Sequence, residues 1–303
     1  MSKVTIDASD CVVVGGGPAG LTAATYLARF RRNVVIFDTY HSRALKIPCS
    51  RNYPCFPQGI AGKEILQKLR RQLYLYKVPI IREAVEHLKL NSNGFQVTTK
   101  NRVINTKNVL LATGVEDIEP DLPNIKKGLQ RKLIHHCPIC DAYELINKRI
   151  AIIEKGKAGL EEALFIREYT PHITLINIEK DTCWTKEELK KIKEASFKVI
   201  NQSIQEITLI PNALKIYFDD NSMAEFDSLY CALGCVKHNQ LGNELKAKQK
   251  EGLFIVDKDQ QTSVVGLYAA GDIVTNLHQL CVAEGQAAIA ATAIHNRCRS
   301  EYD

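Results

Sequence analysis

Long apolar runs are missing from this chain of 303 residues. A helix that crosses a membrane needs about 20 consecutive apolar residues, and no stretch approaches that length. The first ten residues are polar and lead directly into a β-branched segment, so we expect no secretory signal peptide. These absences predict a cytoplasmic protein without membrane association, in a compartment where structural disulfides are rare.

A strong excess of either charge is also missing. The chain has 40 basic and 34 acidic residues, a formal net charge of +6. Basic residues this scattered are more typical of solvated helix faces than of a nucleic-acid-binding surface, so we expect no nucleic-acid partner, while weak attraction to acidic proteins stays open. The apolar fraction of 45% is that of a globular protein, and the length predicts two domains.

A complete set of zinc ligands around Cys231 and Cys235 is absent too. Cys231 and Cys235 have no partner pair, and no histidines cluster near them. We therefore predict core thiols there and no metal site. Cys49 and Cys55 could form a second redox pair, but we favour buried or half-buried free thiols. The remaining cysteines should be mostly reduced and buried.

What the chain does contain is a C-x-x-C pair, Cys137 and Cys140, followed at once by Asp141. Such a pair can close a small disulfide or present a thiolate of lowered pKa. Asp141 is placed to move protons for that thiolate. His135 and His136 precede the pair and could raise its thiolate fraction if protonated, but we favour histidines that satisfy local hydrogen bonds.

A glycine-rich loop stands near the start of the chain. Residues 10–14 read as a strand, residues 21–28 as a helix, and a second strand ends at Asp38. The loop between them follows the pattern G-x-G-x-x-G in the setting that a dinucleotide site requires. Its glycines allow close approach to a pyrophosphate at the helix N-terminus, and Asp38 can accept from ribose hydroxyls. The loop comprises Gly15, Gly16, Gly17, Pro18, Ala19 and Gly20.

The same strand–helix–strand order returns over residues 149–176, which indicates an internal repeat of topology. The loop of this second unit has lost its glycine pattern. Glu154 stands where the first turn glycine is expected, and Lys155 follows. A carboxylate at that position would face the phosphate oxygens of a nucleotide.

Four motifs together resemble the low-molecular-weight thioredoxin reductases in order and spacing. They are the stretch from Cys137 to Asp141, the first glycine loop, Ala112-Thr113-Gly114 and Ala270-Gly271-Asp272. The resemblance covers nearly the whole chain. It implies an α/β fold of two Rossmann-like, three-layer ββα nucleotide-binding domains, the second inserted into the first. The FAD-binding domain would comprise residues 1–116 and 247–303, and the inserted pyridine-nucleotide-type domain, residues 117–246, would carry the C-x-x-C pair.

The resemblance also implies roles for individual residues. Cys140 would be the cysteine nearest the flavin, Cys137 the one that attacks a partner disulfide, and Asp141 the general acid. Gln279 would meet the flavin ring. The implied FAD contacts are Gly15, Gly17, Pro18, Ala19, Gly20, Asp38, Asn52, Val85, Thr113, Gly114, Gly271, Asp272, Gln279 and Leu280.

Two departures from the family pattern concern one ligand, NADPH. The family has glycine where this chain has Glu154 and Lys155, and its strand-end His-Arg-Arg, which grips the 2′-phosphate, falls on Asn177-Ile178-Glu179. Isoleucine cannot pair with a phosphate, and a glutamate repels one. We therefore expect that NADPH is not the ordinary electron donor, with Lys155, Lys157 and Lys180 as candidates for compensation.

These observations predict an FAD-dependent thiol-disulfide oxidoreductase. Electrons would pass from FAD through Cys137 and Cys140 to the disulfide of a thioredoxin-like protein. The resemblance leaves two alternatives open, a thioredoxin reductase that takes electrons from reduced ferredoxin and a dithiol oxidase that uses oxygen. A non-catalytic redox-sensing flavoprotein is disfavoured by the intact Cys-Pro-Ile-Cys-Asp. A homodimer is implied by the family alone.

Overall fold

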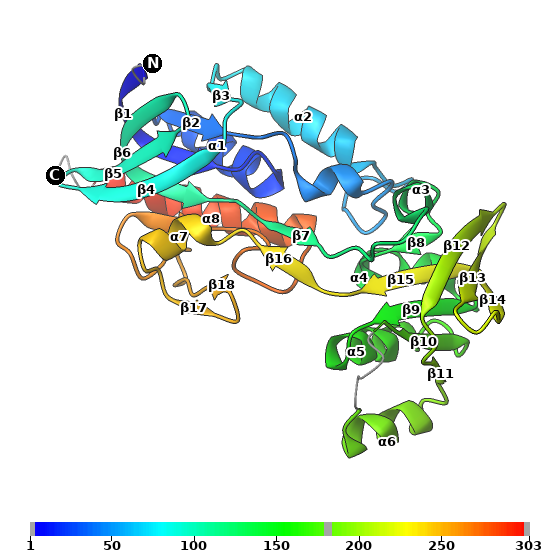
Figure 1. Cartoon of the computed structure of the whole chain (residues 1–303). Helices are drawn as coiled ribbons and strands as arrows, with labels where there is room; N and C mark the ends of the chain where they lie inside the picture. Colours follow the sequence, from blue (N-terminus) through cyan, green and yellow to red (C-terminus); the bar gives the residue numbers. More distant parts are fainter. Residues whose placement is uncertain (1–3, 179–183, 300–303) are drawn as a thin grey trace. The chain divides into compact units, whose positions relative to one another are not determined.

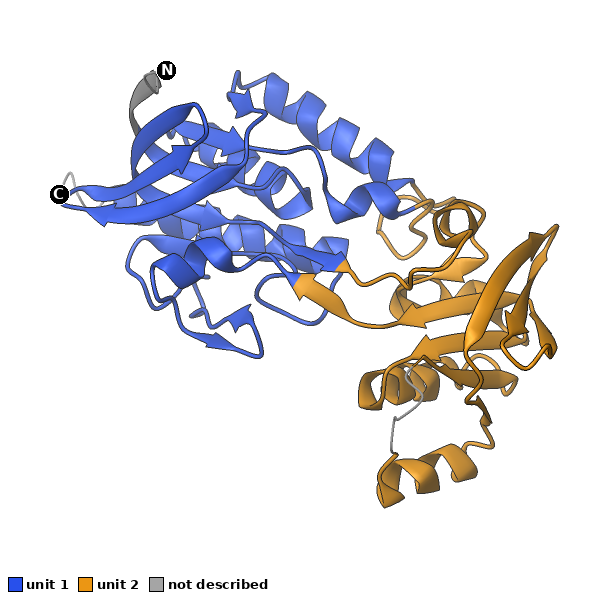
Figure 2. Cartoon of the chain, viewed as in Figure 1, with its two compact units in different colours: residues 1–47, 61–116, 237–303 blue, residues 48–60, 117–236 orange. Residues whose placement is uncertain are grey.

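The computed structural model describes residues 4–178 and 184–299 (Figure 1). The chain divides into two compact units (Figure 2). Unit 1 comprises residues 1–47, 61–116 and 237–303, and unit 2 comprises residues 48–60 and 117–236. At the boundary, β7 (Val115–Asp117) pairs with β16 (Cys235–Lys237) in a two-stranded sheet.

Two segments divide differently from the ranges expected from the sequence. Residues 48–60 group with unit 2, where the Asn52 side chain donates a hydrogen bond to the carbonyl of Ile139. Residues 237–246 group with unit 1, where Glu244 accepts a hydrogen bond from the backbone N–H of Leu88. Neither contact leaves a local sequence pattern, since each joins residues more than 80 positions apart.

Unit 1 is built on a seven-stranded sheet in the order β3-β2-β1-β6-β5-β4, with β19 paired to β6. The strands β1, β2, β3, β6 and β19 run parallel, whereas β4 and β5 form an antiparallel hairpin on the edge. Residues 11–14 of β1 are all buried, as expected for a parallel strand covered on both faces. The strands are β1 (Val4–Val14), β2 (Val34–Phe37), β3 (Ile80–Ile81), β4 (Val85–Asn91), β5 (Gly94–Thr99), β6 (Arg102–Leu111) and β19 (Leu267–Ala269).

Helices cover one face of this sheet. The core on that face brings together Ala23 and Ala24 of α1, Leu66 of α2 and Ala287 and Ala290 of α8, and the small side chains let α1 and α8 approach closely. A second core on the other face includes the hairpin strands and α7. The elements are α1 (Pro18–Arg29), η1 (Arg43–Lys46), α2 (Gly62–Tyr74), α7 (Gln240–Glu244), β17 (Gln249–Lys250), β18 (Leu253–Phe254) and α8 (Leu280–Arg299).

Unit 2 has three layers. Its central parallel sheet runs in the order β11-β10-β9-β15-β8, and a three-stranded antiparallel sheet β12-β13-β14 forms a second layer. Ile152 of β9 packs with Leu160 of α5 on the helical side, whereas the next residue, Ile153, packs with Ile207 of β12 on the other. Successive side chains of a strand point to opposite faces, so this alternation fixes the two cores. The predicted α/β class with two Rossmann-like units is confirmed.

The elements of unit 2 follow the chain from the end of β7. The strands are β8 (Ile134–His135), β9 (Ile150–Glu154), β10 (Ile173–Asn177), β11 (Lys198–Ile200), β12 (Ile204–Ile210), β13 (Ala213–Phe218), β14 (Met223–Phe226) and β15 (Ser228–Ala232). The helical elements are α3 (Ile125–Gln130), α4 (Pro138–Asp141), η2 (Ala142–Leu145), α5 (Lys157–Ile166) and α6 (Lys186–Glu194). Among the helices of the described residues, none combines the length and apolar character that a bilayer crossing requires.

Candidate functional site

The predicted cysteine pair is joined in unit 2. Cys137 and Cys140 form a disulfide with their Cα atoms 5.3 Å apart. Cys137 is the N-cap of α4, and its carbonyl accepts a hydrogen bond from the N–H of Cys140 at 3.0 Å. Pro138 occupies the first helical position, where its fixed φ suits the turn. Both cysteines are half-buried, so the disulfide is within reach of a reactant from outside.

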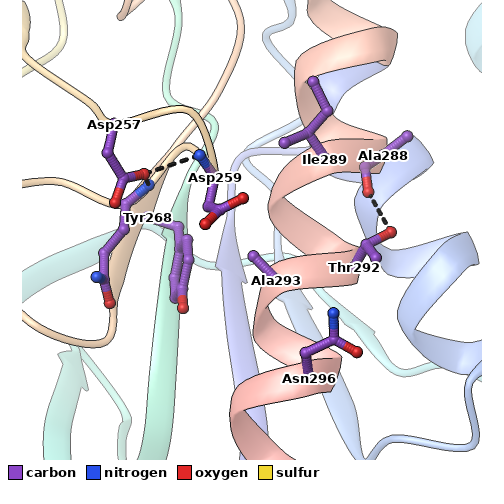
Figure 3. A pocket seen from close by; sticks show the side chains of 9 residues that line it. Asp257, Asp259, Tyr268, Ala288, Ile289, Thr292, Ala293 and Asn296 are labelled. Atoms are coloured by element: carbon purple, nitrogen blue, oxygen red, sulfur yellow. Dashed lines mark hydrogen bonds between the residues drawn. The ribbon is translucent and has the colours of Figure 1, made fainter.

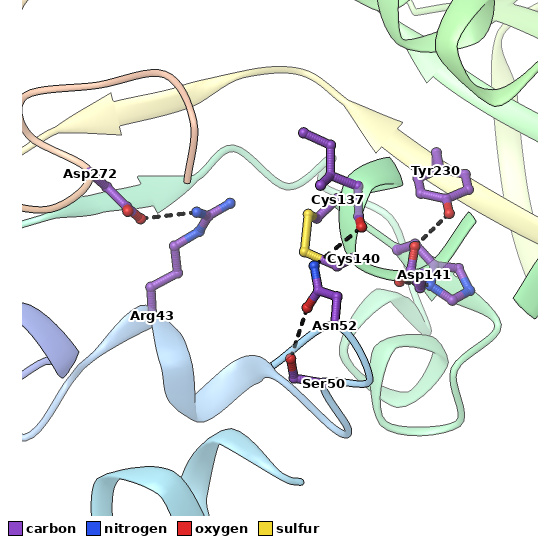
Figure 4. The surroundings of a disulfide bond; sticks show 10 residues. Arg43, Ser50, Asn52, Cys137, Cys140, Asp141, Tyr230 and Asp272 are labelled. Atoms are coloured by element: carbon purple, nitrogen blue, oxygen red, sulfur yellow. Dashed lines mark hydrogen bonds and ion pairs between the residues drawn. A yellow bond between two sulfur atoms is a disulfide. The ribbon is translucent and has the colours of Figure 1, made fainter. Parts of the chain in front are cut away.

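Segment 48–60 lies against the turn that holds this disulfide (Figure 4). The Asn52 amide donates to the Ile139 carbonyl at 3.2 Å, and Ser50 Oγ donates to Asn52 Oδ1 at 3.0 Å. Asn52, predicted as an FAD contact, is therefore placed in the unit of the disulfide. Beside the pair, Ile139 is 48% exposed and Tyr143 is 73% exposed.

The carboxyl group of Asp141 is held by two side chains (Figure 4). The Tyr230 hydroxyl donates to Asp141 Oδ1 at 2.5 Å, and Nδ1 of His135 is in hydrogen-bond contact with Oδ2. The other ring nitrogen of His135 lies 3.1 Å from the Lys132 carbonyl. His135 and Tyr230 are buried, whereas Asp141 is half-buried. Burial, followed by the charge of Asp141, raises the pKa of Tyr230, so its hydroxyl stays protonated and acts as the donor.

Sequence reasoning placed Asp141 beside the thiols but missed Tyr230. The tyrosine is 89 positions away in the chain, and only the pairing of strands β8 and β15 brings it to the site. The expected local hydrogen bond of His135 is present, to the Lys132 carbonyl. Its second contact, to Asp141, was not foreseen because it depends on the turn that follows Cys140.

Acidic groups surround this cluster within unit 2. Burial, with the charge of Asp117, raises the pKa of Glu162 to about 7. Glu144 of η2 lies close enough to add to the pKa shift of Tyr230, as does Glu162 of α5. The neighbourhood is therefore one in which a proton is readily retained.

The other described cysteines are reduced. Cys11, Cys231 and Cys298 are buried, and burial raises the pKa of Cys231 to about 12, as expected for a core thiol. Cys235 and Cys49 are half-buried, and Cys183 lies outside the described residues.

The expectation that the free thiols are mostly buried is wrong for two of them. Cys55 is exposed in a turn with φ of 71°, and Cys281 is exposed in the first turn of α8. Burial requires packed side chains on all sides, and neither position has them. Cys49 and Cys55 are not bonded to each other.

The first glycine loop forms a cradle in unit 1 that only glycine permits. A Cβ at Gly15 would lie 2.2 Å from the Ala112 carbonyl oxygen, and one at Gly20 would lie 1.8 Å from the Gly15 carbonyl oxygen. Helix α1 starts here with Gly17 as its N-cap, without a capping side chain and without an acidic residue in its first turn. The N–H groups of that turn are thus left for an anion, which fits the pyrophosphate of a dinucleotide.

Asp38 lies against this loop and is buried. A Cβ at Gly16 would lie 2.1 Å from Asp38 Cγ, so the missing side chain makes room for the acid. Asp38 Oδ2 accepts from Arg70 at 3.0 Å, and Oδ1 accepts from the N–H of Tyr40 at 2.8 Å. The Arg70 guanidinium also lies over the Tyr40 ring, 4.4 Å from its centroid. Arg70, on α2, was missed because nothing in its local sequence marks it.

The motif Ala270-Gly271-Asp272 packs against the first glycine loop. A Cβ at Gly271 would lie 3.2 Å from the Cβ of Ala19, and the N–H of Gly271 donates to Gln286 Oε1 at 2.8 Å. Asp272 forms an ion pair with Arg43 at 3.1 Å. Two ends of the chain, predicted to share one cofactor, are therefore in contact within unit 1.

The remaining predicted FAD contacts are dispersed over unit 1. Thr113 Oγ1 donates to the His238 carbonyl at 2.6 Å, next to Gly114, whose φ is 65°. Gln279 immediately precedes α8, which begins at Leu280. Val85 lies on the edge strand β4, separated from β1 by β5 and β6.

In unit 2, the loop that follows β9 is filled by the carboxylate of Glu154. Glu154 is fully buried at the end of β9, and its Oε2 accepts from the N–H of Gly156 at 2.5 Å. A Cβ at Gly159 would lie 2.1 Å from Glu154 Cβ, so α5 packs directly on this side chain. At the end of β10, Asn177 is buried and Ile178 is 38% exposed. Glu179 and Lys180 lie outside the described residues.

A cavity of about 470 Å³ lies in unit 1 between α8 and the segment 257–268 (Figure 3). Its polar groups are largely engaged inside the fold. Asp257 Oδ1 accepts from the N–H groups of Asp259 and Gln261, and Thr292 Oγ1 donates to the Ala288 carbonyl. None of the predicted site residues lines this cavity. Within residues 4–178 and 184–299, no three His, Cys, Asp or Glu side chains are arranged to hold a metal ion.

Comparison with known proteins gives consistent similarities. The family described as pyridine nucleotide-disulphide oxidoreductase matches residues 9–287. The thioredoxin reductase of Treponema pallidum (strain Nichols) is 28% identical over 298 residues, 94% of this chain and 95% of that protein. The NADPH-dependent thioredoxin reductase 3 of Arabidopsis thaliana is 27% identical over 306 residues, 92% of this chain and 56% of that protein.

A solved structure agrees in fold. The thioredoxin reductase from Streptococcus pyogenes MGAS5005 superimposes with a TM-score of 0.89 at 22% identity, covering 97% of this chain and 99% of that one. These similarities confirm the resemblance that the four motifs predicted.

Proposed function

Because the chain belongs to the pyridine nucleotide-disulphide oxidoreductase family, we propose that it is an FAD-dependent thiol-disulfide oxidoreductase of the thioredoxin reductase type. Its substrate would be a disulfide of a thioredoxin-like protein. The observation that carries this proposal is the Cys137–Cys140 disulfide, with Asp141 next to it in the same short helix. The names of relatives at 27–28% identity support the same class of reaction.

The residues of unit 1 fit FAD. The glycine cradle and the uncapped start of α1 suit its pyrophosphate, and Asp38 lies at the ribose position of this motif. When bound, FAD supplies the electron pair that reduces the disulfide. The proposed contacts are Gly15, Gly17, Pro18, Ala19, Gly20, Asp38, Val85, Thr113, Gly114, Gly271, Asp272, Gln279 and Leu280, with Asn52 as the one candidate from unit 2.

Cys137 and Cys140 then have different roles in thiol-disulfide exchange with the partner disulfide. The Cys137 thiolate attacks one sulfur of the partner disulfide, and a mixed disulfide forms while the other partner sulfur leaves as a thiolate. Cys140 next attacks Cys137 Sγ, which restores the Cys137–Cys140 disulfide and releases the partner as a dithiol. Asp141 protonates a leaving thiolate. The exposed side chains of Ile139 and Tyr143 suit contact with a protein substrate.

We further propose that NADPH is not the electron donor of this protein. The Glu154 carboxylate, rather than a ligand phosphate, accepts the N–H of Gly156 at the start of α5. A nucleotide phosphate at this place would meet a negative charge instead of a free donor. At the end of β10, Asn177 and Ile178 offer no cation for a 2′-phosphate. Lys155 and Lys157 are the only cations of this loop.

Reduced ferredoxin, an electron-transfer protein, is the donor that we favour in place of NADPH. The net charge of +6 suits a weakly bound acidic protein. Oxygen-dependent oxidation of a dithiol is the other outcome that the family resemblance allows.

One experiment tests donor and function together. The flavin of the purified protein is followed by its absorbance under anaerobic conditions after mixing with NADPH, NADH or reduced ferredoxin. We expect fast bleaching with ferredoxin only, followed by reduction of added oxidised thioredoxin. Fast stoichiometric bleaching at micromolar NADPH would overturn the assignment of the donor. Peroxide formation from a dithiol in air, without thioredoxin turnover, would favour the oxidase instead.

A further inference from the structure

The hydrogen-bond contacts among His135, Asp141 and Tyr230 indicate where one proton lies. The Nε2 atom of His135 lies 3.1 Å from the Lys132 carbonyl. A carbonyl only accepts hydrogen bonds, so Nε2 must carry a hydrogen. In a neutral imidazole the other nitrogen, Nδ1, is then an acceptor, yet Nδ1 is in hydrogen-bond contact with Asp141 Oδ2.

Two acceptors cannot face each other in such a contact. A carboxylate oxygen and an unprotonated Nδ1 would both present lone pairs, so one proton must lie between them. The Tyr230 hydroxyl cannot supply it, because that hydroxyl donates to the other oxygen of Asp141, at 2.5 Å. The contacts therefore require that Asp141 and His135 share one proton.

Two of the three side chains are buried. His135 is 7% exposed and Tyr230 is fully buried. The carboxyl groups near the cluster come from Glu144 on η2 and Glu162 on α5. The next residue along the chain, His136, has its Nε2 atom 3.8 Å from Oε1 of Glu119.

The position of the pair gives the proton a use. Asp141 directly follows Cys140 in α4, and its side chain is 29% exposed. We propose that His135 and Tyr230 are positioning residues that hold one proton on Asp141 for the thiolate that leaves when the Cys137–Cys140 disulfide is opened. This inference rests on the proposed function, in which that disulfide is the redox centre.

The step balances with any dithiol as reductant. A thiolate of the dithiol attacks one sulfur, a new S–S bond forms, and the Cys137–Cys140 bond breaks. The expelled sulfur takes the electron pair and receives the shared proton, which leaves an Asp141 carboxylate beside neutral His135 until water returns a proton. The second thiol of the reductant then displaces the remaining cysteine, and the reductant ends as its cyclic disulfide.

The test uses dithiothreitol, which needs neither a flavin donor nor a thioredoxin. The opening of the Cys137–Cys140 disulfide in the full-length protein is followed by quenching with a maleimide and mass measurement, from pH 5.5 to pH 9. Rates are divided by the concentration of dithiothreitol thiolate at each pH. In the wild type we expect the corrected rate to fall as pH rises, because the shared proton is lost.

Three variants define the expected result. His135→Leu should lower the corrected rate by about tenfold. This loss is smaller than the roughly 10²–10⁴-fold rate effect of a full general acid, because a thiolate is already a good leaving group. His135→Gln keeps hydrogen bonds but cannot transfer a proton, and it should show the same loss. Tyr230→Phe should give a smaller loss. In each histidine variant the dependence of the corrected rate on pH should disappear.

His136→Leu is the matched control, since this neighbouring histidine contacts Glu119 at 3.8 Å, and it should keep the wild-type rate and profile. In an Asp141→Asn background, His135→Leu should have no further effect. Corrected rates within twofold of wild type in both histidine variants, or additive losses with Asp141→Asn, would overturn the proposal. Because no flavin or protein substrate takes part, a protein that fails to turn over thioredoxin could still show the predicted dithiothreitol profile.

Discussion

The carboxylate of Glu154 and the backbone N–H of Gly156 are hydrogen-bonded at 2.5 Å, at the start of α5. In a nucleotide-binding Rossmann unit this N–H group would point at a phosphate. Here the donor is already engaged by a buried anion of the protein itself. The proposal that NADPH is not the electron donor rests on this relationship.

The first prediction concerns this carboxylate. Glu154→Ala should free the N–H of Gly156 and remove a negative charge, so NADPH should bleach the bound flavin at least about tenfold faster than in the wild type, a gain of about 1.4 kcal/mol. Anaerobic stopped-flow absorbance measures the rate. Glu161→Ala removes an exposed acid from the same helix and should leave the rate unchanged. Equal rates in wild type and Glu154→Ala would show that the carboxylate does not control nucleotide use.

The second prediction concerns the glycine cradle. Gly20→Ala would place a Cβ 1.8 Å from the Gly15 carbonyl oxygen, so the loop must shift. We expect the purified variant to have lost most of its FAD, which the ratio of flavin to protein absorbance measures. Gly285→Ala is the matched control, because a Cβ there meets no atom within 4 Å. It should retain FAD, and helix propensity predicts a stability gain of about 1 kcal/mol. A yellow Gly20→Ala protein would contradict the assignment of the loop.

The third prediction separates the roles of the cysteines. Cys140→Ser leaves Cys137 able to attack a partner disulfide but removes the thiol that resolves the mixed disulfide. This variant should bind FAD, show no turnover and accumulate a covalent complex with thioredoxin on a non-reducing gel. Cys137→Ser should trap far less. Cys55→Ser, which removes an exposed thiol of segment 48–60 that is not part of the pair, should turn over normally. Preferential trapping by Cys137→Ser would reverse the two roles.

The fourth prediction follows from the raised pKa of Glu162, about 7 in the folded protein against an ordinary value of 4.5. Between these values the unfolded chain loses this proton while the folded protein keeps it. The free energy of unfolding should therefore fall as pH rises from about 4.5 to about 7, and stay lowered above that range. The contribution of this one group is on the order of 1–3 kcal/mol.

Urea unfolding at pH 5 and pH 8 checks the effect of Glu162. Glu162→Gln cannot ionise, so it should be more stable than the wild type at pH 8 and nearly equal to it at pH 5. Glu161→Gln changes an exposed neighbour of the same type and should follow the wild type at both pH values. A Glu162→Gln protein that loses as much stability between pH 5 and pH 8 as the wild type would remove this group as the cause.

Features encoded by neighbouring residues were predictable from the chain alone. The disulfide joins residues three positions apart. The first glycine loop stands between a strand and a helix that the sequence pattern predicts. Each pattern reports a backbone requirement that few residues meet, such as a Cβ-free approach at Gly20. The doubled strand–helix–strand order followed from the same local signals, and the α/β class followed from the family resemblance that the four motifs carry.

Only the tertiary structure decided which side chains complete these sites. Tyr230 reaches Asp141 across 89 positions, Arg70 reaches Asp38 across 32, and Asn52 joins the disulfide unit by its bond to Ile139 across 87. Such contacts depend on strand pairing and on the packing of a whole unit, and no periodicity or spacing in the sequence records them. The sequence determined that the chain carries a C-x-x-C pair and a glycine loop between a strand and a helix, whereas the fold determined which side chains hold Asp141, because burial and hydrogen-bond geometry exist only once distant segments have packed together.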